Sequence, residues 1–300
     1  MFNFKSDIQF INYFRLFNFV SLILILISVG FIFYKGLNFG VDFKGGTLIE
    51  LRVENAEIGI GDVRQSFIKM NLGDVNVKKF GKGNDYLIKF EQTDKNKENF
   101  IENIKTQLSK NLAGNFSFRR VENVGPKVSG ELLKSGLIAI VLSLSAMLIY
   151  IWIRFEWQFS LGAIIALIHD VIITIGFFSI LEFEINLSIV AAVLTIVGYS
   201  MNDTVVIFDR VRENLKKYSS KSINEISNLS INETLSRTII TSLTTLLALL
   251  SIFFFGGKIL HGFSFAMILG VIFGTYSSIF IANPILIKLK VNQKSLLKED

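Results

Sequence analysis

The residues of this sequence that are best suited to chemistry are polar and ionisable side chains standing inside long apolar stretches. On insertion scales a charged group at the centre of a membrane span costs about 2.5–3.5 kcal/mol, so each such residue requires a reason. Asp203 lies between one and two helical turns before the end of one stretch, and Arg237 directly precedes the next. The other polar positions inside the stretches are His169, Asp170, Asn202 and Thr204. A carboxyl group in such a place is suited to binding and releasing a proton.

Asp203 and Arg237 come out at similar depths if the two stretches cross a membrane in opposite directions. An ion pair between them is then possible, and each charge would lower the insertion cost of the other. The alternative is that Arg237, at a helix end, extends its guanidinium to the lipid headgroups. Asp203 is too short to do the same, which favours a functional acid over a purely structural one.

Asp170 and His169 are adjacent and stand closer to the middle of their stretch. Neighbouring helical residues point roughly 100° apart, so we expect only one of the two to face a given partner. We interpret Asp170 as a proton relay or a helix–helix hydrogen-bonding group, and His169 first as a packing residue. Asn202 and Thr204 are candidates for the same relay or hydrogen-bonding roles.

The composition excludes several classes of protein. Of 300 residues, 51% are hydrophobic and only 19% are charged, against about 25% charged in soluble domains. There is no cysteine, which excludes disulfides, thiolate metal sites and thiol nucleophiles. The only histidines, His169 and His261, are far apart in the sequence, so no histidine-rich metal site is predicted.

Six stretches approach the roughly 20 apolar residues that a membrane span requires. The first is too long for the apolar region of a typical signal peptide, so we interpret it as an uncleaved span. Gly270-x-x-x-Gly274 in the last stretch is typical of a helix-packing face. The predicted order is an N-terminal tail (1–16), a span (17–34), a soluble domain (35–134), spans at 135–153, 160–181 and 186–208, a loop (209–236), spans at 238–255 and 262–287, and a C-terminal tail (288–300).

The distribution of Lys and Arg predicts the orientation of these spans. Twelve of these residues lie in the tails and in the connections 154–159 and 209–236, against one in the two short loops of the other side. Cytoplasmic connections carry the excess of Lys and Arg. Both ends of the chain are therefore predicted to be cytoplasmic and the soluble domain extracytoplasmic.

The soluble domain has alternating strand and helix patterns in the order β-α-β-β-α-β, which is the ferredoxin-like order. The predicted elements are a strand at 42–54, a helix at 61–70, a hairpin of strands 75–80 and 86–90 around Gly81–Asp85, a helix at 97–112 and a strand at 115–124. The fold class is thus a polytopic α-helical membrane protein with a small α+β domain. No segment has the GxxxxGK[ST] pattern that cradles nucleotide phosphates, so we do not expect an enzyme with its own ATPase site.

Five ordered motifs resemble the SecD/SecF family of protein-export membrane proteins, within the resistance-nodulation-division superfamily. The most characteristic is GYSMNDTVVIFDRVREN at 198–214, which includes Gly198, Asp209 and Arg210. The motif DFKGGT contains Asp42, Gly45 and Gly46. The other three are VGPKVSGEL at 124–132, HDV at 169–171 and SRTIITSLTTLLALLSIFFFGG at 236–257.

The resemblance implies a subunit of the bacterial inner membrane that uses the proton gradient in protein export. The implied partners are SecD, the SecYEG channel, the ATPase SecA and exported preproteins, with YajC and YidC as further candidates. By motif position it assigns proton coupling to Asp203 and Arg237, with protons as coupling ion and no cofactor. Two alternatives remain at this point: half of a small-molecule exporter of the same superfamily, and a translocon scaffold that uses no energy. The sequence leaves open whether the ion is H⁺ or Na⁺.

Overall fold

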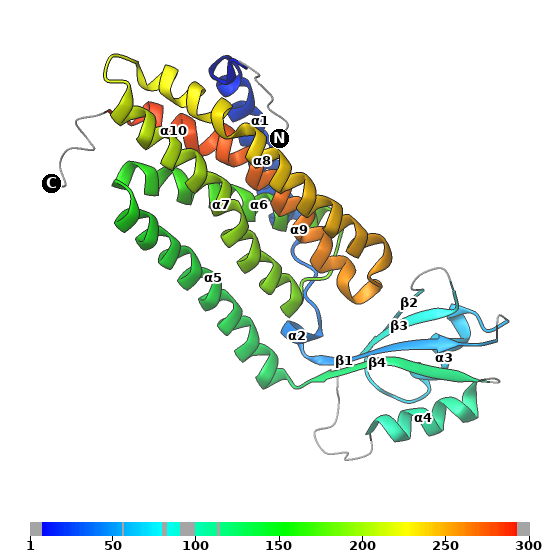
Figure 1. The fold of residues 1–300 in the computed structure, drawn as a ribbon. Coiled ribbons are helices and arrows are strands. Elements are labelled where there is room, and N and C mark those ends of the chain that lie inside the picture. Colours follow the sequence, from blue (N-terminus) through cyan, green and yellow to red (C-terminus); the bar gives the residue numbers. More distant parts are fainter. Residues whose placement is uncertain (1–7, 56, 80–82, 91–99, 113–114, 293–300) are drawn as a thin grey trace. The chain divides into compact units, whose positions relative to one another are not determined.

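A computed structural model describes residues 8–55, 57–79, 83–90, 100–112 and 115–292. The chain divides into two compact units (Figure 1). One is a helical unit of residues 1–38 and 136–300, and the other is an α+β unit of residues 39–135. Each unit is described below by itself.

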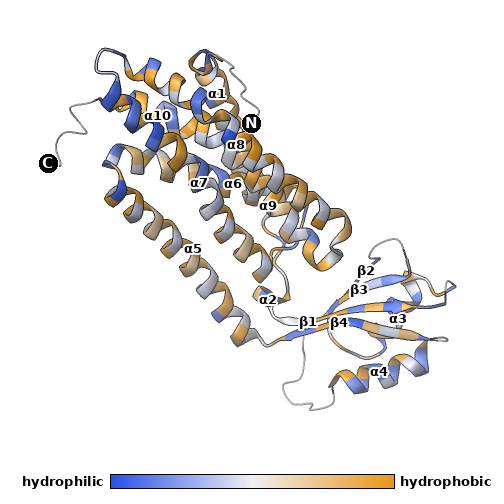
Figure 2. Cartoon of the chain, viewed as in Figure 1, coloured by the Kyte–Doolittle hydropathy of each residue, from blue (hydrophilic) through white to orange (hydrophobic). Residues whose placement is uncertain are grey.

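The helical unit contains six helical segments that are long and apolar enough to cross a membrane. Apolar residues cover most of their length, as the colouring in Figure 2 shows. The prediction of six apolar helices is therefore confirmed. They are α1 (Phe10–Lys35), α5 (Pro126–Arg154), α6 (Trp157–Ile180), α7 (Leu187–Lys217), α8 (Ile223–Phe255), and a last segment formed by α9 (Lys258–Ser277), a π-helical turn (Ser278–Ala282) and α10 (Asn283–Lys288).

Helices α7 and α8 extend well beyond their apolar stretches, so most of the predicted loop 209–236 is helical. Helix α7 begins at Asn186, whose side chain accepts a hydrogen bond from the amide of Ile189 at 3.2 Å. Helix α8 begins at Ser222, which forms a reciprocal capping box with Glu225. Such caps satisfy amide groups that a helix start would otherwise leave unpaired.

Small residues allow two of the helices, α7 and α9, to approach each other closely. A Cβ added to Gly270 of α9 would lie 2.3 Å from Cγ1 of Ile196 on α7. One added to Gly274 would lie 2.9 Å from Cβ of Ser200. The predicted packing role of the Gly270-x-x-x-Gly274 motif is confirmed, and it brings the backbones of α7 and α9 together beside Asp203.

The α+β unit is a four-stranded antiparallel sheet in the order β2-β3-β1-β4, which confirms the predicted ferredoxin-like arrangement. Alternate residues of the strands pack against the helices, and the core includes Ile49, Leu51, Phe67, Ile88 and Leu108. The elements are α2 (Val41–Lys44), β1 (Gly46–Val53), α3 (Ile60–Ile68), β2 (Val75–Lys79), β3 (Asp85–Phe90), α4 (Phe100–Asn111) and β4 (Phe116–Val124).

The predicted strand at 42–54 is wrong at its start. Val41–Lys44 form a short helical turn, which ends where the amide of Gly45 bonds to the carbonyl of Val41. Gly45 and Gly46 both have positive φ angles, of 77° and 111°, which residues with side chains rarely adopt. The glycine pair therefore separates the turn from β1. The predicted hairpin turn at 81–85 and the start of the predicted helix at 97 lie partly outside the described residues.

Candidate functional site

Asp203 is buried in the helical unit, with 3% of its surface exposed. Its Oδ2 atom accepts hydrogen bonds from Ser242 Oγ of α8 at 3.4 Å and from Thr275 Oγ1 of α9 at 3.3 Å. These two hydroxyl oxygens are themselves 2.6 Å apart. One carboxyl group thus joins three helices through neutral hydroxyls.

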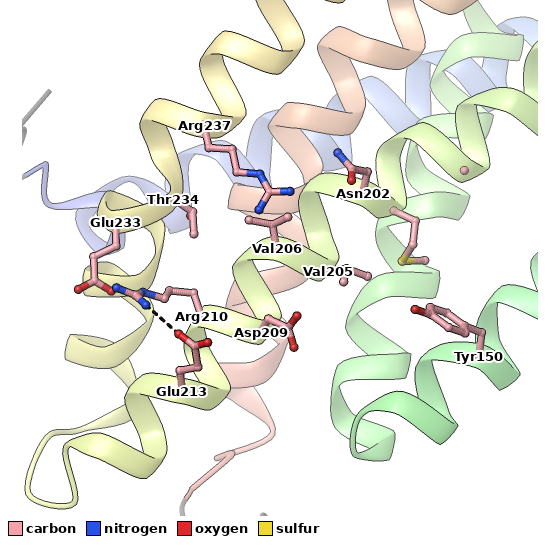
Figure 3. Close-up of a pocket in the computed structure, with 12 residues that line it drawn as sticks. Tyr150, Asn202, Val205, Val206, Asp209, Arg210, Glu213, Glu233, Thr234 and Arg237 are labelled. Atoms are coloured by element: carbon pink, nitrogen blue, oxygen red, sulfur yellow. Dashed lines mark hydrogen bonds and ion pairs between the residues drawn. The ribbon is translucent and has the colours of Figure 1, made fainter. Parts of the chain in front are cut away.

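Arg237 does not form an ion pair with Asp203 in this structure. Its side chain is exposed and lines a cavity of about 680 Å³ between α5, α7 and α8. The guanidinium extends toward α7 near Val206 and Asn202 (Figure 3). These two residues flank Asp203 along α7, so Asp203 and Arg237 lie on adjacent helix segments, as predicted. Their pairing stays a prediction.

The same cavity collects several of the motif residues. Gly198 and Asn202 line it, and Arg210 at its far end forms ion pairs with two glutamates. Arg210 bonds to Glu233 Oε2 at 2.6 Å and to Glu213 Oε2 at 2.7 Å. The pair with Glu233 joins the end of α7 to α8, whereas the pair with Glu213 lies within α7. The full lining is Tyr150, Gly198, Met201, Asn202, Val205, Val206, Asp209, Arg210, Glu213, Glu233, Thr234 and Arg237.

Asp209, a residue of the motif at 198–214, forms an ion pair outside the contact between α7 and α8. Its Oδ1 atom accepts a hydrogen bond from Arg154, at the end of α5, at 3.2 Å. Both side chains are nearly half exposed. Pairs of this kind contribute about 0–1 kcal/mol, so Asp209 orients the end of α5 more than it stabilises it.

Asp170 forms a second polar centre and is fully buried. Oδ1 lies 2.8 Å from His169 Nδ1, and Oδ2 lies within hydrogen-bond distance of two hydroxyl groups, Ser200 Oγ at 2.7 Å and Ser277 Oγ at 2.8 Å. As expected, only one of the two residues faces a given partner on another helix, because Ser200 and Ser277 bond to Asp170 and not to His169; the side chains of His169 and Asp170 also contact each other. His169 also packs, as predicted, with its ring stacked on Tyr276 at a centroid distance of 5.9 Å.

The two remaining predicted residues are separated by the structure. Thr204 is buried, and its Oγ1 atom lies 2.8 Å from Ser278 Oγ of the π-helical turn, a helix–helix hydrogen bond. Asn202 is exposed and points into the cavity (Figure 3). Asn202 therefore lines the same cavity as Arg237, and Thr204 joins α7 to the π-helical turn without contacting either acid.

Sequence reasoning missed the hydroxyl residues that hold both carboxyl groups. Ser200, Ser242, Thr275 and Ser277 give no signal of their own, because a serine or threonine inside a helix ordinarily bonds to the carbonyl four residues earlier. Tyr276 was missed as well, although its hydroxyl joins Ser21 Oγ at 2.7 Å. Among the described residues, no group of three or more His, Cys, Asp or Glu could hold a metal ion.

Comparison with known families adds an independent observation. The model of "Protein export membrane protein SecD/SecF, C-terminal" matches residues 104–292. The model of the "SecD/SecF GG Motif" matches residues 30–57, where Gly45 and Gly46 stand. The chain belongs to the SecD/SecF family. With its six apolar helices, this SecD/SecF family member is a multi-pass membrane protein.

The relatives agree with this assignment. The "Protein translocase subunit SecF" of Rickettsia bellii is 49% identical over 283 residues, which cover 94% of this chain and 93% of the relative. That of Rickettsia prowazekii is 48% identical over 285 residues, or 94% and 91% of the two chains.

Two solved structures of SecDF have the same fold as this SecD/SecF chain. SecDF of Thermus thermophilus, described as a translocon-associated membrane protein, matches with a TM-score of 0.86 at 33% identity. A structure of SecDF in a super-membrane-facing form matches with a TM-score of 0.70 at 33% identity. Each match covers 97% of this chain but only 40% of the SecDF chain.

Proposed function

We propose that this chain is a subunit of the Sec protein-export machinery that works with SecD and draws on the proton gradient. In this role it promotes the late, ATP-independent movement of preproteins through the SecYEG channel. The names of its relatives support the export role, and the 40% coverage of SecDF supports a partner that supplies the rest of that chain. The single observation that carries the proton role is the buried carboxyl group of Asp203, held only by neutral hydroxyls.

The setting of the proposal is the bacterial inner membrane, with both chain ends in the cytoplasm and the α+β unit outside. The excess of Lys and Arg in the tails and in residues 209–236 supports this orientation. SecA is the proposed partner that hydrolyses ATP, and this sequence carries no phosphate-binding loop motif of its own. YajC and YidC are further partners under the same proposal.

The proposed mechanism alternates two states of Asp203. In one state it is ionised and paired with Arg237, and in the other it is protonated and separated from Arg237. The hydroxyls around Asp203 and the position of Arg237 in the cavity support assigning the present arrangement to the second state. Moving one charge through the full membrane potential is worth about 2.3 kcal/mol per 100 mV. This energy would shift a two-state equilibrium about fifty-fold.

The test uses inverted membrane vesicles that contain this chain with its partners. Translocation of a preprotein is started with ATP, the ATP is then exhausted, and completion is followed with and without a proton gradient. The variant is Asp203→Asn, which keeps the shape of the side chain and removes its titratable proton. The matched control is Asp74→Asn, which makes the same change at an exposed position of the α+β unit.

We expect the gradient to drive completion in wild type and in Asp74→Asn but not in Asp203→Asn. Assembly with SecD, followed by co-purification, should be the same for all three proteins. If Asp203→Asn assembles and still responds to the gradient, Asp203 is structural, and a scaffold function replaces the proposed one.

A further inference from the structure

Asp170 is a fully buried acid that the proposed role of Asp203 and Arg237 does not use. It lies on α6, and its hydrogen-bond partners come from α6, α7 and α9. Because every partner atom is itself buried, no contact of this carboxyl group leads directly to solvent. Three separate elements are built around one acid, which is more than helix packing requires.

The groups that face Asp170 include no fixed positive charge. On α6 the facing group is His169, on α7 it is the hydroxyl of Ser200, and on α9 it is the hydroxyl of Ser277. Asp203, one turn beyond Ser200 on α7, has its carboxyl group turned to the hydroxyls of α8 and α9. Among the described residues, no Lys or Arg forms an ion pair with Asp170. A buried carboxylate without a cation is strongly disfavoured, so the site must gain a proton.

The second nitrogen of His169 shows where that proton is. His169 Nε2 is buried and has no hydrogen-bond partner. On a protonated ring this atom would be a charged N–H donor with no acceptor, which is costly in a buried place. On a neutral ring it is an unused lone pair, which costs less. The neutral ring therefore donates through Nδ1 to Oδ1, and the additional proton belongs on Oδ2 of Asp170.

The hydrogen bonds around Oδ2 accommodate this proton without leaving a donor unused. Ser277 Oγ lies 2.8 Å from Oδ2 and 3.2 Å from the carbonyl oxygen of Gly274. When Oδ2 carries the proton, it donates to Ser277 Oγ, and Ser277 donates to the Gly274 carbonyl. When the proton leaves to a water molecule, the Ser277 hydroxyl turns and donates to Oδ2. Ser200 donates to Oδ2 in both cases.

We propose that Asp170 and His169 form a second proton-binding site, loaded in this conformation, which α9 couples to Asp203. The coupling follows from two neighbouring hydroxyls, because Thr275 bonds to Asp203 and Ser277 bonds to Asp170. A shift or rotation of α9 that breaks one of these contacts also moves the other. The π-helical turn directly after Ser277 is a place where such a shift can be absorbed. The transport role of the pair rests on the proposed function, whereas the bound proton does not.

The bound proton can be observed in the full complex with SecD by infrared spectroscopy. A protonated carboxyl group has a C=O stretching band that an ionised one lacks. We expect a band at neutral pH in wild type that is lost in Asp170→Asn and retained in Asp203→Asn, which removes only the separate contribution of the Asp203 carboxyl group. If the Asp170→Asn complex assembles and its carboxyl bands equal those of wild type, Asp170 is ionised and the proposal is overturned.

A second variant decides the question if Asp170→Asn fails to assemble. Ser277→Ala removes the acceptor of the proposed O–H group, so the band should shift to higher frequency. The matched control is Ser251→Ala on the exposed face of α8, where the hydroxyl bonds only to the Leu247 carbonyl. This control should leave the band in place. An unchanged band in Ser277→Ala would contradict the assignment.

The vesicle assay separates this inference from the proposed function. We expect gradient-driven completion to be lost in Asp170→Asn as well as in Asp203→Asn. Loss in Asp203→Asn alone would keep the proposed function and overturn the coupling through α9. A retained gradient response in both variants would refute the proposed function, while the infrared band would still decide whether Asp170 holds a proton.

Discussion

The close contact of α7 with α9 predicts that Gly270→Ala destabilises the wild-type chain but stabilises a chain in which Ile196 is replaced by alanine. In Gly270→Ala the new Cβ would lie 2.3, 2.7 and 2.9 Å from Cγ1, Cδ1 and Cγ2 of Ile196. Carbon atoms pack best at about 3.5–4.0 Å, so the helices must separate by roughly 1 Å or more, or Ile196 must leave its rotamer. Ile196 has no exposed surface, which leaves it little room to move.

The magnitude follows from two opposing terms. Overpacking of this kind costs about 1–3 kcal/mol, whereas alanine is about 1 kcal/mol better than glycine inside a helix. Gly270→Ala should therefore destabilise the wild-type chain by up to about 2 kcal/mol. Ile196→Ala removes all three of the contacting carbons. In that background Gly270→Ala should be stabilising, because the clash is gone and the new methyl group fills part of the cavity.

The free energy of unfolding is measured in mixed detergent micelles. The four proteins of the double-mutant cycle are wild type, Gly270→Ala, Ile196→Ala and the variant with both changes. We expect a coupling energy of about 1–3 kcal/mol between the two positions. Gly30→Ala on α1, where an added Cβ meets no atom within 4 Å, is the matched control and should be neutral or slightly stabilising. If Gly270→Ala has the same effect in both backgrounds, the helices are not in the contact described, and the positioning of Thr275 and Ser277 loses its basis.

Two predictions concern the α+β unit. Asp85 accepts two hydrogen bonds from Arg52, at 2.7 and 2.9 Å, and only 6% of its side chain is exposed. Asp85→Asn should lower the free energy of unfolding by about 1–2 kcal/mol. Glu122→Gln breaks a more exposed pair with Arg120 and should lower it by less than about 1 kcal/mol. Hydrogen exchange of the β1 and β3 amides measures both values, and equal values would contradict the ranking. Burial, reinforced by neighbouring positive charges, lowers the pKa of Lys89 from 10.5 to about 8. The unfolded chain therefore binds this proton more tightly, so the stability of the unit should rise with pH between about 8 and 10.5. Lys89→Met should reduce that rise, which pulse proteolysis in urea measures. An unchanged pH dependence in the variant would refute the lowered pKa of Lys89.

The elements predictable from the sequence were those with a strong repeating pattern. Apolar stretches of sufficient length predicted the six helical segments, and alternation with turn signals predicted the four strands and their order. The start of the first strand was mispredicted because residues 42–44 alternate like a strand, while the positive φ angles of Gly45 and Gly46 are a backbone property. The helical structure of residues 209–217 and 223–236 depends on the Arg210–Glu233 pair and on the Ser222 cap of α8, which hydropathy does not register.

The candidate site was predictable only in its charged members. Asp170 and Asp203 stand out because an acid in an apolar stretch is costly. The hydroxyls that hold them come from other helices, and their meeting depends on how α9 lies against α7. That geometry in turn depends on Gly270 and Gly274, whose spacing indicates a packing face but not its partner. The separation of Asp203 from Arg237 depends on the direction in which the Arg237 side chain extends, which no sequence pattern specifies.

The central claim is that Asp203 carries the proton that couples the gradient to export. The most direct measurement is proton flux into proteoliposomes that contain this chain with SecD, after a gradient is imposed, for wild type, Asp203→Asn and Asp74→Asn. We expect flux in wild type and in Asp74→Asn, and none above the level of empty liposomes in Asp203→Asn. Equal flux in all three, with intact assembly, would contradict it.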